Sequence, residues 1–152
     1  MYFQELSSDS RLWVYQSGRA FTAVEKEGIT NKLNEFVSQW AAHGMALKGE
    51  AIIVNDHFIV LSVDERFESA SGCSIDSSVK LMKDIGQEYS LDFFNRLKLI
   101  VEKDSEMKVI SFSDLGEYED WNIYNTLVNT VDQFNNSFLI PVKESELFKM
   151  IC

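Results

Sequence analysis

The residues best suited to chemistry lie in one short polar run, residues 71–78, which places a cysteine where a helix is predicted to begin. The first turn of a helix exposes unpaired backbone N–H groups and the positive end of the helix dipole. A thiol placed there ionises more readily, and an anion can bind beside it. We therefore expect the functional site of the chain at this helix start, around Cys73.

One hypothesis for this site is thiol chemistry, with Cys73 as nucleophile and His43 as base. Asp64 or Asp76 would orient the imidazole and complete a triad-like arrangement. The alternative is that Cys73 is a small buried hydrophobic residue, while His43 only satisfies carbonyls at a helix end. These four residue types would also suit zinc, but the chain has no Cys-x-x-Cys or His-x-x-x-His spacing. We therefore predict no metal and no cofactor.

A second hypothesis is a pocket for a small anion. Backbone amides and hydroxyl groups suited to a phosphate or carboxylate come from Ser71, Gly72, Ser74 and Ser77. Arg19, after the first strand, or Arg66, in the loop before the run, would supply the countercharge. The alternative is that Ser71 or Ser74 is only an N-cap and that Asp76 is an ordinary acidic residue of a first helical turn.

Composition narrows the classes of protein. The 152 residues fit one domain, residues 1–152, and a hydrophobic fraction of 45% is sufficient for a core. Twenty-four acidic residues against fourteen basic ones give a formal charge of −10, and the basic residues are scattered singly. Nucleic acids and anionic membranes are therefore disfavoured as partners. With two cysteines, no secretory signal and no membrane-length apolar run, we expect a cytoplasmic protein with free thiols.

The first half of the chain predicts a strand, a helix and a hairpin. Residues 12–16 are rich in β-forming types. Thr22 and Glu25 have the spacing of a capping box and begin an amphipathic helix expected to end at His43 and Gly44, with Thr30 as an alternative start. Two β-branched runs that form the hairpin cover residues 51–54 and 58–63.

The second half predicts a long helix beginning near Ser74 and a second hairpin, residues 97–102 and 107–112. Between them we expect a short helical turn over residues 91–96, capped by Ser90. The remaining segments are a helix at 113–121, an ambiguous stretch at 124–134, an extended stretch at 138–140 and a helical turn at 145–150.

Adjacent hairpins favour an α+β fold with a mostly antiparallel sheet and two main helices. A ferredoxin-like arrangement, with a split βαβ core, fits the first five elements. A profilin-like or longin-like sheet with helices on its faces fits nearly as well.

Several segments resemble a small family of uncharacterised bacterial proteins that often carry the label "ABC transporter ATPase". The resembling segments are residues 13–16, 40–44, 63–65, 71–79, 127–130 and 140–142. The resemblance covers nearly the whole chain but implies no activity, and it ends at residues 145–148, where the family has an aromatic-rich Ser-Trp element. The ATPase label is not supported, because the chain has no Gly-x-x-x-x-Gly-Lys-Ser/Thr phosphate-binding loop.

Without a complete catalytic signature, the sequence favours a non-enzymatic binding or regulatory protein. Its expected ligand is a small anion or a protein partner, held at residues 71–78. The alternative function is a thiol-dependent enzyme that uses Cys73 and His43. Composition and motifs leave the oligomeric state open.

Overall fold

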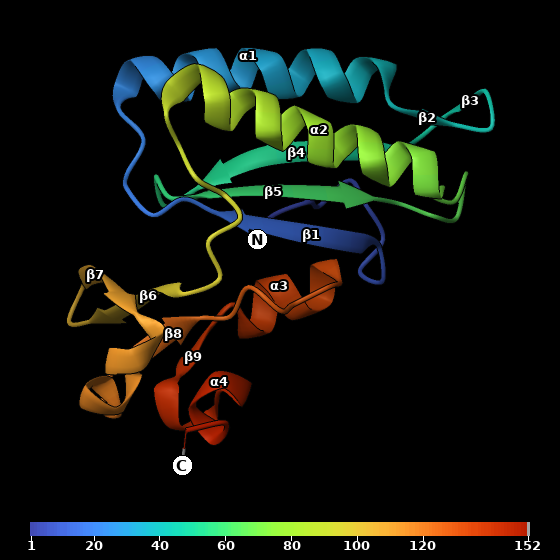
Figure 1. Ribbon diagram of the computed structural model, residues 1–152. Helices are drawn as coiled ribbons and strands as arrows, with labels where there is room; N and C mark the ends of the chain where they lie inside the picture. The colour runs from blue at the N-terminus through green and yellow to red at the C-terminus, as the bar shows by residue number, and fades with distance from the viewer. Residues whose placement is uncertain (152) are drawn as a thin grey trace.

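The structure, a computed structural model, describes residues 1–151 and is built in layers (Figure 1). A three-stranded antiparallel sheet has the order β1 (Arg11–Gln16), β5 (Phe58–Val63), β4 (Gly49–Val54). A four-stranded antiparallel sheet has the order β7 (Glu106–Ser111), β6 (Lys98–Lys103), β8 (Asn122–Tyr124), β9 (Leu139–Pro141). The predicted α+β class is confirmed, although the antiparallel strands divide between two main sheets.

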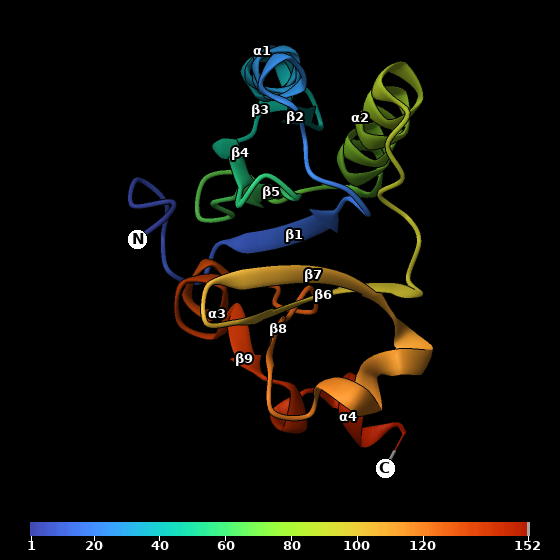
Figure 2. The same ribbon diagram turned by 90° about the vertical axis from the view of Figure 1, so that its left-hand side faces the viewer.

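Helices cover the outer faces of the two sheets. The two long helices, α1 (Ala23–Gln39) and α2 (Gly72–Tyr89), lie side by side over the three-stranded sheet, and the four-stranded sheet lies beneath it (Figure 2). The 3₁₀ helices η1 (Phe112–Tyr118) and η2 (Val142–Glu144) and the short helix α4 (Glu146–Lys149) contribute to the core on the other side of the second sheet. Helix α3 (Val131–Ser137) contributes to the core between the sheets.

Strand β5 is central because both of its faces are covered. Ile59, Leu61 and Val63 point into the core beneath α1 and α2. Phe58 and Val60 point into the core shared with the second sheet. All six residues of β5 are buried, which explains why the sequence shows a continuous apolar run here rather than an alternating one.

The strand order confirms the split βαβ arrangement for the first sheet. Strands β1 and β4 both run antiparallel to β5, so they are parallel to each other with β5 between them. The second predicted hairpin, β6–β7, is also confirmed, but it belongs to the other sheet and does not extend this one.

The predicted start of α1 is confirmed, and its predicted end is wrong. Thr22 and Glu25 form the capping box. The helix stops at Gln39, because the extended residue Trp40 donates an indole hydrogen bond to the Ser74 carbonyl (2.8 Å). The next residues form a two-strand ribbon, β2 (Ala41–Ala42) and β3 (Met45–Ala46).

The short helix predicted over residues 91–96 is also wrong. Ser90 has a left-handed backbone (φ 56°) and ends α2 as its C-cap. Asp92 and Asn95 then accept hydrogen bonds from the backbone N–H groups of Phe94 (2.9 Å) and Leu97 (3.0 Å). These side-chain turns compete with helix formation, so the segment is a loop.

The last third follows the predictions only in part. The helix expected at 113–121 is the 3₁₀ helix η1, and the extended stretch at 138–140 corresponds to β9. The final turn, α4, is confirmed, with Ser145 as its N-cap. None of the helices formed by residues 1–151 has both the length and the apolar character needed to cross a membrane.

Candidate functional site

At the start of α2 the serine hydroxyl groups bind the backbone of their own helix. The Ser71 Oγ accepts from the Ser74 N–H (3.1 Å), and the Ser74 Oγ accepts from the Ser71 N–H (2.7 Å). The Ser77 Oγ donates to the Cys73 carbonyl (2.9 Å). The structure therefore supports the interpretation of Ser71 as an N-cap, and Ser74, which is buried, faces the core rather than a ligand.

Cys73 is exposed, which contradicts the alternative of a buried small hydrophobic residue. Its sulfur has no hydrogen-bond partner within residues 1–151. Gly72 and Asp76 are exposed on the same turns, and Asp76 takes part in none of the ion pairs of the described chain. This helix start therefore presents a thiol to solvent without a base beside it in a hydrogen bond.

His43 is a turn residue and not the end of a helix. It lies with Gly44 between β2 and β3, and both have left-handed backbones (φ 53° and 74°), as a two-residue hairpin turn requires. The Trp40–Ser74 hydrogen bond does bring this segment to the start of α2. In the described chain no hydrogen bond joins His43 to Cys73, Asp64 or Asp76, and no three His, Cys, Asp or Glu residues are placed to hold a metal.

Asp64 holds a loop in place and does not orient an imidazole, which was one of the roles predicted for it. Its carboxylate is fully buried and accepts two hydrogen bonds from the Arg66 guanidinium, at 2.9 Å from Nε and 2.7 Å from Nη2. It also accepts from the backbone N–H of Ser7 (3.1 Å). The Arg66 guanidinium holds the pKa of this carboxyl well below its usual range. Asp64 is therefore an anchor for the loop that follows β5.

Arg19 lies at the wrong end of α2 to serve an anion at residues 71–78. Its guanidinium donates to both oxygens of Glu25 (2.9 and 2.8 Å) and to the carbonyl of Tyr89, the last residue of α2 (2.7 Å). Eighteen residues of helix separate the two ends, which is about 27 Å. The Arg19 hydrogen bonds hold the pKa of Glu25 at about 2. Arg19 thus links the start of α1 to the end of α2.

The loop before α2 contains a feature that sequence reasoning missed. The Phe67 side chain is 64% exposed, and two cations lie near its ring. The Lys48 Nζ is 4.7 Å from the centre of the ring, and the Arg66 guanidinium carbon is 5.7 Å from it. The sequence does show Phe67 as an aromatic residue within a polar loop, and this could have indicated an exposed ring. Nothing in the sequence indicates that Lys48 lies beside Phe67. We call Phe67, Lys48 and Arg66 the Phe67 platform.

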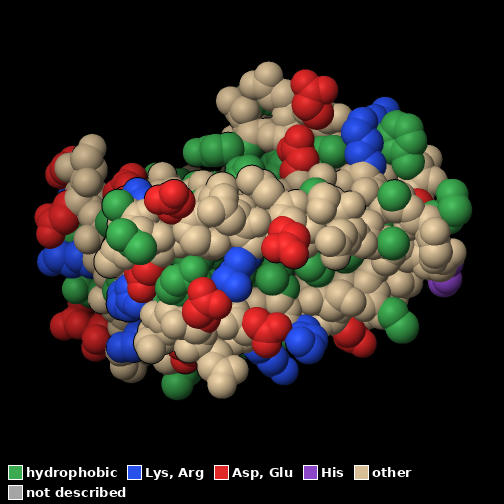
Figure 3. Space-filling model, turned by 90° about the horizontal axis from the view of Figure 1, so that it is seen from above, with side chains coloured by type: hydrophobic (Ala, Val, Ile, Leu, Met, Phe, Trp, Pro, Cys, Tyr) green, Lys and Arg blue, Asp and Glu red, His purple; other side chains and the backbone are tan. Residues whose placement is uncertain are grey.

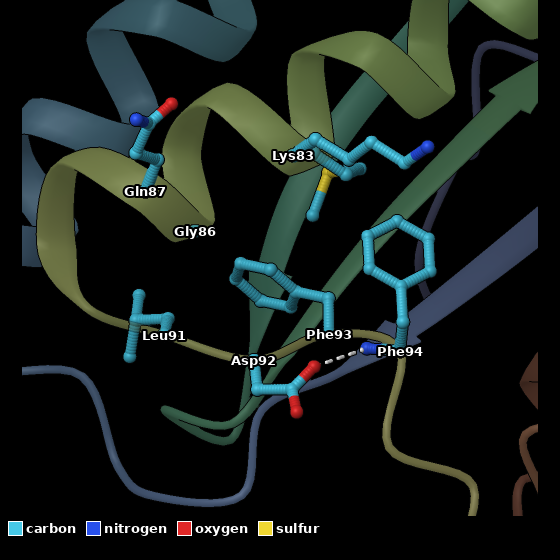
Figure 4. A pocket seen from close by; sticks show the side chains of 8 residues that line it. Lys83, Gly86, Gln87, Leu91, Asp92, Phe93 and Phe94 are labelled. Carbon is cyan, nitrogen blue, oxygen red and sulfur yellow. Dashed lines mark hydrogen bonds between the residues drawn. The ribbon is translucent and has the colours of Figure 1, made fainter.

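Two hollows lie elsewhere on the molecule. The first, of about 270 Å³, lies between the second half of α2 and the loop after it, and its lining includes Met82, Lys83, Phe93 and Phe94 (Figure 4). The second, of about 420 Å³, is lined by the N-terminal segment, the β4–β5 turn and residues of β8, α3 and β9. Neither hollow includes a residue of the predicted site.

Comparison of the chain with models of protein families, with curated proteins and with solved structures gave no match. The resemblance to the bacterial family therefore stays a prediction. What the chain binds has to be argued from its own geometry.

Proposed function

We propose that this chain is a non-enzymatic binding or regulatory protein of the cytoplasm, which binds a partner protein through the Phe67 platform. The observation that carries the proposal is the exposed Phe67 ring with two cations beside it. Aromatic residues and arginine are enriched where protein interfaces are most tightly packed. A ring that remains 64% exposed while its neighbours hold it is suited to such a contact.

The loop that carries Phe67 is held in shape before any partner arrives. The buried Asp64 carboxylate holds the Arg66 side chain and also accepts from the Arg66 backbone N–H (3.2 Å). The Glu65 carboxylate accepts from the Ala70 N–H (2.9 Å), which closes the loop on itself. A surface that is already ordered loses less conformational entropy on binding, so more of the contact energy becomes affinity.

The charges of the platform favour an acidic partner segment with an apolar side chain. Lys48 forms no ion pair within residues 1–151, and its ammonium is therefore free to meet a partner carboxylate. The backbone N–H groups of Gly72 and Cys73 also have no partner in that range, and they lie at the positive end of α2. We therefore retain the prediction that the start of α2 binds an anion, and we expect this anion to be a carboxylate of the partner protein. The formal charge of −10 disfavours a nucleic acid in that place.

A second exposed apolar side chain comes three residues before Lys48 in the chain. Met45, on β3, is 59% exposed. The end of the molecule where α2 begins and β2–β3 turns back shows hydrophobic side chains beside lysine or arginine side chains, on the right of the view from the helix side (Figure 3). A partner that covers this end would meet apolar contacts as well as positive charge.

The proposal is tested by selecting peptides from a random phage-displayed library on the wild-type protein alone and then measuring the binding of the selected peptides to Phe67→Ala. We expect selected peptides to be rich in Asp or Glu together with an apolar or aromatic residue. Peptides that bind Phe67→Ala as well as the wild type would contradict the proposal, and so would peptides without acidic residues. Phe94→Ala is the matched control, because Phe94 is 46% exposed and also has a lysine near its ring.

The alternative, a thiol-dependent enzyme, requires His43 to assist the Cys73 thiol. We expect His43→Ala to leave the rate of Cys73 alkylation by iodoacetamide at pH 7 unchanged, because no hydrogen bond joins the two residues in the described chain. Cys73→Ser corrects the measured rate for Cys152. A large fall in rate in His43→Ala would instead favour the enzyme.

A further inference from the structure

Strand β4 is an edge of the three-stranded sheet and lies below α1 (Figure 2). The Asp64 N–H donates to the Lys48 carbonyl (2.8 Å), and the register between β4 and β5 continues from this pair without a break. Backbone groups alternate in direction along a strand, so every second residue from Lys48 bonds to β5 and the others point away from it. The residues whose N–H and C=O groups point away are Gly49, Ala51 and Ile53.

These outward backbone groups are open to a partner. Within residues 1–151, the N–H and C=O groups of Gly49, Ala51 and Ile53 make no hydrogen bond. Residues 49–53 are all partly exposed. The edge of β1, on the other side of the sheet, is closed in part, because the Leu12 N–H donates to the Asn129 carbonyl (3.0 Å). The open edge of this sheet is therefore β4.

Strand β4 lacks the features with which proteins usually protect a sheet edge. It contains no proline and no lysine. Its six pairs with β5 follow one another in step, so the strand has no bulge. A regular edge of this length, about 20 Å at the usual rise per residue, is a template on which another extended chain can pair.

The open edge continues from the Phe67 platform. Lys48, whose ammonium lies 4.7 Å from the centre of the Phe67 ring, directly precedes Gly49. Glu50 is the one charged residue of β4, and burial and the Glu5 carboxylate raise its pKa, so a further carboxylate beside it is disfavoured. A segment that pairs here would therefore carry its acidic residue at the Lys48 end and uncharged residues along β4.

From these observations we infer that an extended segment of the partner protein adds to β4 as a fourth strand of this sheet. The inference rests on the proposed function, because it extends the same contact from the Phe67 platform along the sheet edge. Alternate residues of the segment would meet two apolar surfaces: Ala51 and Ile53 pack on the core below α1, and Ile52 packs on the core between the sheets. A second copy of the chain is a poorer occupant, because two chains of formal charge −10 repel each other.

Hydrogen exchange measured by NMR tests the inference, with a peptide selected on the wild-type protein as the probe. In the free protein the amides of Ala51 and Ile53 should exchange fast, while those of Ile52 and Val54, which bond to β5, exchange slowly. With saturating peptide, exchange at Ala51 and Ile53 should slow at least about tenfold. Unchanged exchange at these two amides with peptide bound would overturn the inference, and so would slow exchange at both in the free protein.

A proline at an outward position tests the hydrogen bonds themselves. Ala51→Pro removes an outward N–H but no bond to β5, which edge strands tolerate, and it should raise the Kd of the peptide about tenfold. Val109→Pro is the matched control and should leave the Kd unchanged, because β7 is also an edge strand and the two-residue turn at Asp104 and Ser105 directs the Val109 N–H outward. A folded Ala51→Pro variant that binds as the wild type does would contradict the inference.

A scan of N-methylated peptides gives the same test without changing the protein. Each backbone N–H of the peptide is replaced in turn, and every second replacement should weaken binding, because alternate amides of an added strand face β4. Binding that shows no such alternation would count against an added strand.

Phe67→Ala separates this inference from the proposed function. A peptide that needs Phe67 but leaves exchange at Ala51 and Ile53 unchanged would support the platform and overturn the added strand. A peptide that binds Phe67→Ala as tightly as the wild type and still slows exchange at both amides would overturn the platform and support the added strand.

Discussion

At the scale of residues, burial decides what an acidic side chain does. Asp64 has the residue type of a catalytic orienting group, but its carboxylate is fully buried and bonded to Arg66 and to the Ser7 backbone. A buried carboxylate with such partners contributes to folding and not to proton transfer. Asp76, on the exposed face of α2, has neither contact.

Asp64→Asn should lower the free energy of unfolding by about 2 kcal/mol at pH 7, because charged hydrogen bonds are replaced by neutral ones. The folded-state pKa of Asp64 is depressed, so its contribution is fully present above the unfolded pKa of about 3.9 and is lost as the pH falls below it. The stability gap between wild type and variant should therefore narrow from pH 5 to about pH 3.

Urea unfolding at several pH values measures this gap, with the exposed Asp76→Asn as control. A gap that is unchanged on acidification would mean that Asp64 is not an ionised anchor.

Glu25 offers a direct check of the link between α1 and α2. Its carboxylate accepts from Arg19 and from the Thr22 backbone, and its pKa is about 2. In Arg19→Gln the pKa of Glu25 should rise toward the ordinary value of about 4.3, because the largest cause of the shift is removed. NMR titration of the Glu25 side-chain carboxyl carbon follows this change. An unchanged pKa in the variant would show that Arg19 does not hold this carboxylate.

At the scale of elements, the two ends of α2 differ in how closely the chain packs around them. A Cβ added at Gly72, at the start, would meet nothing within 4 Å. A Cβ added at Gly86, in the last turn, would lie 2.6 Å from the Leu91 carbonyl oxygen. The Leu91 N–H also donates to the Gly86 carbonyl (2.9 Å), so the chain that leaves α2 folds back against it.

Gly86→Ala should therefore destabilise the protein by about 2 kcal/mol or more, because the backbone of residue 91 must move. Gly72→Ala should be neutral or slightly stabilising, since alanine favours helix and has room there. Thermal unfolding of both variants measures the difference. Equal changes in stability for the two variants would mean that the chain after α2 packs less closely against Gly86 than the structure shows.

The elements also show what can be predicted from sequence. The start of α1 follows from a local pattern, the spacing of Thr22 and Glu25. The three strands of the first sheet follow from runs of β-forming residues. The end of α1 could not be predicted, because the indole of Trp40 bonds to a carbonyl thirty-four positions along the chain. In the candidate site, the N-cap role of Ser71 was predictable, but the placement of Lys48 over Phe67 arises only when β4 and the loop after β5 come together.

At the scale of the whole molecule, two sheets share one core and leave the ends of the strands free to carry function. Of the two cations of the Phe67 platform, Arg66 is paired with the buried Asp64 carboxylate, and Lys48 has no ion pair within residues 1–151, on a chain whose formal charge is −10. An acidic partner is therefore attracted by Lys48 and repelled by the net charge of the chain.

This charge distribution predicts that partner binding weakens with salt. Raising the ionic strength from 0.01 M to 1 M shortens the screening length from about 30 Å to about 3 Å, so the contribution of Lys48 should largely disappear. A selected acidic peptide should lose affinity by about tenfold over this range. Fluorescence anisotropy of the labelled peptide follows this loss, and an affinity that does not change with salt would contradict the expected role of Lys48.

The central claim is that the exposed Phe67 ring, held by Lys48 and Arg66, is what the partner contacts. Calorimetric titration of a peptide selected on the wild-type protein tests it most directly, with Phe67→Ala and Phe94→Ala compared at one salt concentration. We predict that Phe67→Ala raises the Kd at least about tenfold and that Phe94→Ala leaves it unchanged. Equal Kd values for the wild type and Phe67→Ala would contradict the claim.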